Sequence, residues 1–95
     1  MATDMRRGHL FIEGKVQGVG FRHFTKINAR EIGVHGWVRN LLDGRVEAVF
    51  EGPEDHVDEL VARCEEGPGA SRVDAIDFEW EEATGEFDDF KVQAY

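Results

Sequence analysis

The feature that most constrains the fold of this 95-residue chain is the order in which two hydrophobic spacings follow one another. Apolar residues three and four positions apart are typical of a helix that buries one face. The clearest run with this spacing is Val57, Leu60, Val61 and Cys64. Residues 76–80 instead alternate apolar and acidic side chains, which indicates a half-buried strand. Together these patterns predict the order strand, helix, strand, strand, helix, strand, with one further strand at the C-terminal end.

Glycine and proline set the predicted limits of several elements. Gly33 ends a predicted helix, because glycine commonly follows the last helical residue. Asp43-Gly44 predicts a hairpin turn, and Pro53 is predicted to be the first residue of the second helix. The strand with Val46 is expected to be half-buried. The predicted elements cover residues 8–13, 21–32, 34–41, 46–50, 53–66, 76–81 and 90–94.

The predicted order matches the ferredoxin-like βαββαβ arrangement of the α+β class. In this arrangement two helices cover one face of an antiparallel sheet, and here an additional C-terminal strand is expected. The length fits one domain, residues 8–95, which follows a polar tail of residues 1–7. With 41% hydrophobic residues, the chain can bury a core.

The charge of the chain is strongly negative and unevenly distributed. The net charge of −9 disfavours nucleic acid and anionic membranes as partners, since both are bound by basic surfaces. Residues 1–41 carry seven basic and three acidic groups, whereas residues 42–95 carry four basic and seventeen acidic groups. An anion site is therefore expected in the first half. Many acids with only three lysines resemble proteins of salt-loving organisms, and an ordinary acidic protein is the alternative.

The remaining composition points to an intracellular chain without a metal. The single cysteine, Cys64, allows no intrachain disulfide or cysteine cluster, and its place on an apolar helix face predicts a packing role. The four histidines lack metal-ligand spacing, and no stretch reaches the roughly 20 apolar residues of a membrane span. No secretory segment follows the N-terminus. We expect a cytoplasmic monomer without cofactor or metal, with Trp37 and Trp80 in its core.

The glycine-rich segment 14–22 lies between the first strand and the first helix. Its glycines allow the backbone to turn N–H groups toward one point, and a helix N-terminus favours negative charge. We predict that an anion is held by the guanidinium of Arg22 and by the backbone of the segment. The predicted binding residues are Val16, Gln17, Gly18, Val19, Gly20, Phe21 and Arg22. The alternative is a structural turn beside a surface arginine.

Asn40 stands near the end of the strand before the Asp43-Gly44 turn. An amide side chain could orient a water molecule there without placing negative charge beside a bound anion. The alternative is a turn-capping asparagine, which is a common use of that residue.

The two segments together resemble the acylphosphatase family. Residues 12–22 fit its pattern aliphatic-x-Gly-x-Val-Gln-Gly-Val-x-Phe-Arg, and residues 36–40 read Gly-Trp-Val-Arg-Asn, with Gly44, Val46 and Gly52 at the expected intervals. The resemblance implies metal-independent hydrolysis of the carboxyl–phosphate anhydride of acyl phosphates. It assigns phosphate binding to Arg22 and water orientation to Asn40. Leu41 departs from the pattern, because many members carry threonine there. If that hydroxyl assists binding or water placement, the departure implies slower hydrolysis or a greater dependence on Asn40.

Two other functions remain open at this point. The first is a non-catalytic module that senses an acyl or carbamoyl phosphate, although such a module would not need a water-orienting Asn40. The second is the acylphosphatase-like domain of larger hydrogenase-maturation proteins, which the absence of zinc-finger cysteines before Tyr95 disfavours. His23 is the only histidine near the expected site, and we interpret it as a helix-surface residue. The natural acyl phosphate is not identified by the sequence.

Overall fold

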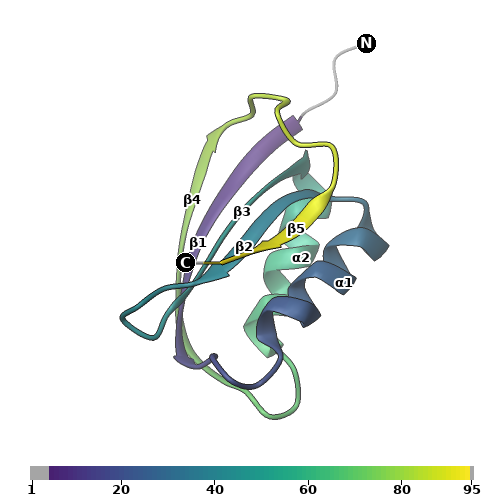
Figure 1. Cartoon of the computed structure of the whole chain (residues 1–95). Helices are drawn as coiled ribbons and strands as arrows, with labels where there is room; N and C mark the ends of the chain where they lie inside the picture. The colour runs from purple at the N-terminus through teal and green to yellow at the C-terminus, as the bar shows by residue number, and fades with distance from the viewer. Residues whose placement is uncertain (1–4, 95) are drawn as a thin grey trace.

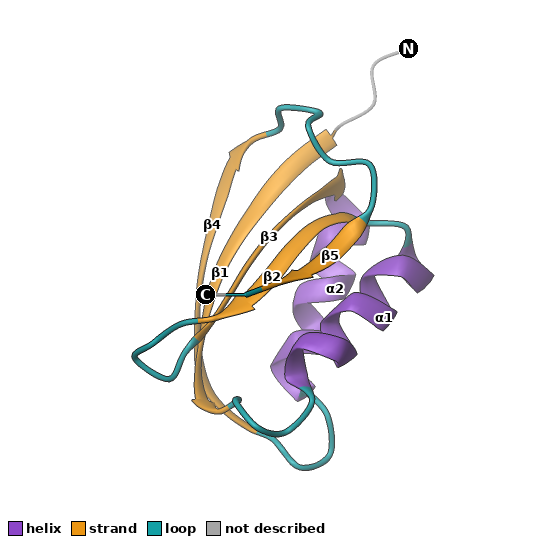
Figure 2. Cartoon of the chain, in the orientation of Figure 1, coloured by secondary structure: helices purple, strands orange, loops and turns teal. Residues whose placement is uncertain are grey.

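The helices and strands follow one another in the predicted order (Figure 1). The structure is a computed structural model that describes residues 5–94. Its elements are β1 (Met5–Lys15), α1 (Phe21–Ile32), β2 (His35–Asn40), β3 (Val46–Pro53), α2 (Glu54–Glu66), β4 (Arg72–Glu82) and β5 (Phe90–Gln93). The five strands form one sheet in the order β4-β1-β3-β2-β5. Both helices lie on the same side of this sheet (Figure 2), as the ferredoxin-like prediction requires.

The sheet is antiparallel through its first four strands and mixed at one edge. β1 pairs with β3 and β4 in antiparallel fashion, and β2 pairs with β3 in the same way. β5 is the additional strand that the sequence predicted, and it joins β2 in parallel register with Gly36 opposite Phe90. The parallel pairing follows from the chain path, because β5 begins beside the start of β2.

Several limits differ from the predicted ones. β1 begins at Met5, so residues 5–7 of the predicted tail belong to the sheet, and residues 1–4 lie outside the described residues. Arg6 and Arg7 are held there by carboxylates, at 3.0 Å from Glu54 and from Glu51 respectively. Pro53 ends β3 and caps α2 with an extended ψ of 147°, so it precedes the first helical residue.

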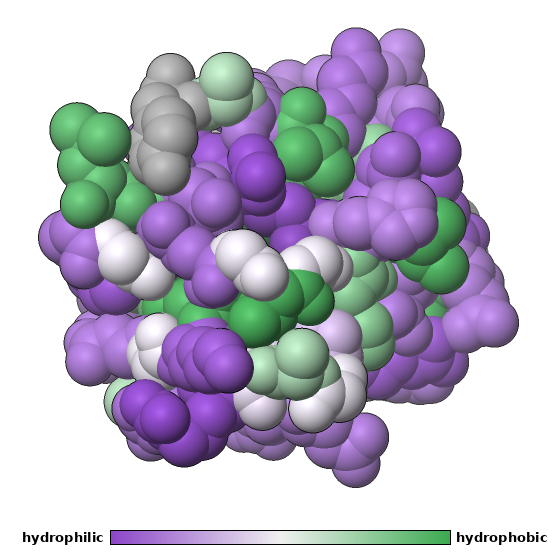
Figure 3. Space-filling model, turned by 60° about the horizontal axis from the view of Figure 1, so that its bottom comes forward, coloured by the Kyte–Doolittle hydropathy of each residue, from purple (hydrophilic) through white to green (hydrophobic). Residues whose placement is uncertain are grey.

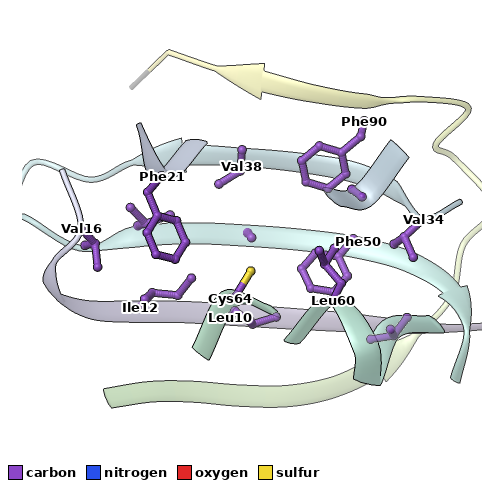
Figure 4. Packing of buried hydrophobic residues seen from close by; sticks show 14 residues of the cluster. Leu10, Ile12, Val16, Phe21, Val34, Val38, Phe50, Leu60, Cys64 and Phe90 are labelled. Atoms are coloured by element: carbon purple, nitrogen blue, oxygen red, sulfur yellow. The ribbon is translucent and has the colours of Figure 1, made fainter. Parts of the chain in front are cut away.

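The core lies between the helices and the sheet (Figure 4). Leu10, Ile12 and Phe50 project from the central strands and are fully buried. Leu60 and Cys64 meet them from α2, also without exposure. Burial raises the pKa of the Cys64 thiol to about 12, so the thiol stays protonated and the predicted packing role is confirmed.

The other face of the sheet is covered by side chains, which corrects the prediction of a half-buried β3. Glu47 and Glu51 on this face are only 6% and 3% exposed. Glu47 accepts hydrogen bonds from His9 Nε2 at 2.6 Å and from Arg39 Nε at 2.8 Å. β3 is the central strand, and its neighbours extend long charged side chains across it.

Trp37 also belongs to this outer face and not to the core. The Arg39 guanidinium lies 5.2 Å from the centre of its ring, a distance suited to a cation–π contact. Successive residues of a strand point to opposite faces. Because Val38 is fully buried under the helices, Trp37 and Arg39 must point away from them.

Gly14 ends the regular pairing of β1 and directs the chain toward the glycine-rich loop. The register with β4 shifts between Glu13 and Gly14, where φ is +132°. A Cβ atom at this position would lie 2.1 Å from the Arg72 carbonyl oxygen. Only glycine fits this β-bulge, which re-aims the strand end.

Candidate active site

Backbone donors without partners gather where the loop enters α1. Gly18 and Gly20 have φ of +74° and +78°, the left-handed conformation that glycine adopts most readily. Among the described residues, no hydrogen bond is donated by the N–H groups of residues 16–20. The first bond at the start of α1 runs from the Phe24 N–H to the Gly20 carbonyl oxygen at 3.0 Å. The amides of residues 21–23 are therefore also free, at the positive end of the helix dipole.

The space above this loop is open to a ligand. No atom lies within 4 Å of a Cβ placed on Gly18 or on Gly20, so these glycines are required by backbone conformation and not by crowding. Figure 3 turns this end of the molecule forward and shows weakly polar and apolar residues at its centre, surrounded by hydrophilic ones. The backbone at Gly18 and Gly20 is thus exposed on the surface.

Arg22 differs from the other arginines of the chain. Seven of the eight arginines have a carboxylate oxygen within 4.0 Å. Arg22, in the first turn of α1, has none within the described part of the chain, and no acidic residue shares that turn. In a chain of net charge −9, this leaves a permanent positive charge available to a ligand.

Asn40 lies at the end of β2, on the face that the helices cover. It is 8% exposed, and its buried Oδ1 has no hydrogen-bond partner among the described residues. Buried acceptors are nearly always satisfied, so an exception needs an explanation. A water or ligand donor in the adjoining pocket would satisfy it.

One pocket of about 380 Å³ joins these groups. Its volume lies within the range of roughly 300–1,000 Å³ usual for small-molecule sites. No acidic side chain is among the residues that line it, which are Val16, Gly18, Gly20, Phe21, Arg22, His23, Lys26, Asn40 and Val92. The structure therefore brings together two segments, from the first loop and from the end of β2, that are far apart in the sequence.

Gln17 and Val19 do not line the pocket. The Gln17 side-chain amide donates to the carbonyl oxygens of Leu41 at 2.7 Å and Arg45 at 3.0 Å. It thereby ties the loop to the β2–β3 hairpin, and Val19 packs against the core. The residue pattern alone did not indicate that the Gln17 side chain would bridge these two segments.

Lys26 and Val92 line the pocket although neither was among the predicted binding residues. Lys26 follows Arg22 by four residues on one helix, and that spacing was the available signal. Val92 comes from β5, whose pairing with β2 no local pattern indicated. Arg39 points to the opposite face, where it pairs with Glu47 at 2.7 Å.

A second hollow of about 420 Å³ adjoins the first and shares Asn40 with it. It is lined by the residues of the hairpin from Arg39 to Asp43, and the Leu42 side chain is 91% exposed. The Leu41 backbone is fixed by three contacts, since its N–H donates to the Arg45 carbonyl oxygen and its own carbonyl accepts from the Gly44 N–H and from the Gln17 side chain. No hydroxyl is supplied by residue 41.

A family model, a curated sequence and a solved structure that match this chain share one description, acylphosphatase. The family model described as acylphosphatase matches residues 8–92. The acylphosphatase of Roseiflexus sp. (strain RS-1) is 55% identical over 89 residues, which cover 94% of this chain and 96% of that protein. The crystal structure of the acylphosphatase from Bacillus subtilis matches with a TM-score of 0.90 at 33% identity, over 93% of this chain and 98% of that one.

A further match is to part of a larger protein. The crystal structure of full-length HypF, in a phosphate- and nucleotide-bound form, matches with a TM-score of 0.85 at 26% identity. The match covers 99% of this chain but only 12% of that protein.

No helix within residues 5–94 has the length and apolar character needed to cross a bilayer. The chain belongs to the acylphosphatase family.

Proposed function

We propose that this acylphosphatase-family chain hydrolyses acyl phosphates with Arg22 and the loop amides holding the phosphoryl group and Asn40 orienting the attacking water. The observation that carries the proposal is the meeting of three features in one pocket. Within residues 5–94, these are amides at a helix N-terminus with no acceptor, an arginine with no carboxylate partner and a buried amide oxygen with no donor. In the proposed complex, the phosphoryl oxygens would pair with the amides and with Arg22, and the attacking water would donate to the Asn40 oxygen.

The reaction needs positioning and charge stabilisation more than a strong base. The water oxygen attacks phosphorus, the bond between phosphorus and the bridging oxygen breaks, and the carboxylate leaves with the electron pair. A phosphoryl oxygen accepts the proton of the water, so inorganic phosphate is the second product. A carboxylate is a good leaving group, and the attacking and leaving oxygens lie in line.

Leu41 leaves Asn40 as the water-orienting group of the hairpin. The Leu41 side chain offers no hydrogen bond, and the Leu41 N–H and carbonyl are both engaged within the loop and the hairpin. We therefore infer that water placement depends on the Asn40 amide more strongly than it would beside a threonine.

The test is release of phosphate from benzoyl phosphate in the presence of EDTA. Arg22→Ala removes a group that would stabilise transferring phosphoryl oxygens, and a loss of about 10²–10³-fold in kcat/KM is expected. Arg6→Ala is the matched control, since it removes the same charge from the opposite end of β1. Equal rates for the Arg22→Ala variant and the wild type would refute the assignment.

We further infer a monomer with no nucleic-acid partner, because a net charge of −9 repels further copies of the chain and phosphate backbones alike. A cytoplasmic location is also proposed. A salt-adapted surface is one account of the excess of acids, and ordinary acidity is the other. Unfolding midpoints at about 0.1 M and about 2 M salt distinguish them. A salt-adapted chain gains stability at the higher concentration by more than an ordinary acidic protein of similar size does.

A further inference from the structure

α1 places a second unpaired cation in the pocket. Lys26 lies one turn after Arg22, is half-buried and lines the same space. As with Arg22, no carboxylate oxygen lies within 4.0 Å of its ammonium among residues 5–94. Side chains of a helix lean toward its N-terminus, so Lys26 is directed back toward the first turn and the pocket.

One phosphoryl group does not account for both cations. The free loop amides and the Arg22 guanidinium already supply a full set of donors for its oxygens. The pocket volume of about 380 Å³ leaves space beside a phosphoryl group. No lysine within residues 5–94 has a carboxylate oxygen within 4.0 Å, and Lys26 is the one that lines this pocket, so its charge is available there to a second negative group.

The direction of the reaction decides which part of the substrate approaches Lys26. The water lies at Asn40, which belongs to the sheet layer, and the leaving oxygen must lie on the opposite side of phosphorus. The acyl part therefore extends away from Asn40, toward the helix layer that carries Lys26. The apolar hollow around Leu42 adjoins Asn40 and so lies on the side of the water.

We propose that Lys26 is a specificity-determining residue that binds a second negative group, a carboxylate or a phosphate, on the acyl part of the substrate. The preferred substrates are then acyl phosphates whose acyl group is itself anionic. This inference rests on the proposed function of the same pocket.

The test compares two substrates that differ in one group. Fumaryl monophosphate carries a terminal carboxylate where crotonyl phosphate carries a methyl group, and the trans double bond keeps this carboxylate from attacking its own carbonyl. Each kcat/KM is divided by the spontaneous hydrolysis rate of the same compound. The wild type is expected to favour fumaryl monophosphate by about three- to tenfold at low salt, and by much less at about 1 M salt, where charges are screened.

Lys26→Gln is the variant, because glutamine keeps the length and helix preference of the side chain without its charge. It is expected to lower the rate with fumaryl monophosphate several-fold more than the rate with crotonyl phosphate. Lys91→Gln is the matched control: Lys91 stands opposite Trp37 in the sheet and so belongs to the outer face. This control should keep the wild-type ratio.

The outcomes separate the two proposals. A wild-type ratio near one, or an equal loss with both substrates in Lys26→Gln, overturns the role of Lys26 while hydrolysis itself stands. Absence of turnover with either substrate overturns the proposed function and this inference with it. A ratio that falls toward one in Lys26→Gln and persists in Lys91→Gln supports the inference.

Discussion

Replacing Asn40 by alanine should separate activity from stability. The side chain is 8% exposed, and its Oδ1 has no donor within the described residues. A buried polar atom without a partner destabilises a fold by about 1–3 kcal/mol, and a pocket water that donates to Oδ1 offsets part of that cost. Truncation also removes contacts of one or two methyl-sized groups, at about 0.8 kcal/mol each. The free energy of unfolding of Asn40→Ala is therefore expected to be unchanged or to rise by about 1 kcal/mol.

The activity of the same variant should fall sharply. Loss of one preorganised hydrogen-bonding group in a site of this kind lowers the rate by about 10²–10³-fold. Binding of phosphate should persist, because the loop amides and Arg22 are untouched. Phosphate at ten times its Kd should then still stabilise Asn40→Ala by about 1.4 kcal/mol, and this stabilisation should be lost in Arg22→Ala.

Urea unfolding followed by tryptophan fluorescence, with and without phosphate, measures these free energies, and phosphate release from benzoyl phosphate measures activity. Leu60→Ala is the opposite control. Leu60 is a fully buried side chain of α2 away from the pocket, and its truncation should lower the free energy of unfolding by about 2–5 kcal/mol. The activity per folded molecule of Leu60→Ala should remain. A loss of 2 kcal/mol or more in Asn40→Ala would refute the view that its amide oxygen is unsatisfied in the folded chain.

Four further substitutions test other parts of the structure. Gln17→Ala removes two hydrogen bonds between the loop and the hairpin, so urea unfolding should show a loss of about 1–3 kcal/mol, and KM should rise. Gly20→Ala should fold but lose about 1–2 kcal/mol of stability, because its Cβ meets no atom but its φ is +78°. Gly36→Ala should fail to fold, because its Cβ would lie 2.0 Å from the Val49 carbonyl oxygen. Circular dichroism distinguishes the two outcomes. Burial alone would lower the pKa of His9, but its hydrogen bonds to Glu47 and Glu81 raise it above the usual 6.5. The contribution of His9 to stability is therefore complete below pH 6.5 and declines as pH rises through the folded-state pKa. Urea midpoints measured across this pH range should show the decline in the wild type and a weaker decline in His9→Gln. His35→Gln, at an exposed position, is the control and should keep the wild-type decline.

The limits of α1 and of the hairpin were predictable because local backbone chemistry determines them. α1 spans the predicted residues, since Gly20 and Gly33 at its two ends both adopt left-handed φ. At the hairpin, the Leu41 N–H donates to the Arg45 carbonyl oxygen and Gly44 has φ +98°, as the Asp43-Gly44 pair indicated. These features depend on residues that are adjacent in the chain.

The burial of β3 was not predictable from its own residues. Alternation identifies which side chains share a face, but not what covers that face. Glu47 and Glu51 look like solvent-exposed positions until β1 and β2 are placed on either side of β3. Arg7 then reaches Glu51, and His9 and Arg39 reach Glu47, so that ion pairs cover the outer face.

The candidate site divides in the same way. Arg22 and the loop amides were indicated by a contiguous motif, whereas the role of Asn40 was implied by the resemblance of residues 36–40 to the acylphosphatase family and not by its place at a strand end alone. The four-residue spacing from Arg22 was a local signal for Lys26, but the bridge from Gln17 to the hairpin and the contribution of Val92 to the pocket depend on how separate elements pack. Tertiary contacts of this kind are outside the reach of local patterns.

The first turns of the two helices explain why the site lies where it does. α2 begins with Glu54 and Asp55, which complement the positive end of its dipole. α1 begins with no acid and carries Arg22 there, an arrangement that the dipole disfavours by about 0.3–1 kcal/mol. The chain has acids in excess and neutralises its other arginines with them, so the unfavourable charge at α1 is not a consequence of composition. Under the proposed function, a bound phosphoryl group would remove this repulsion and accept hydrogen bonds from the free amides at the same time, so the unfavourable charge at the start of α1 is the arrangement expected of an anion site.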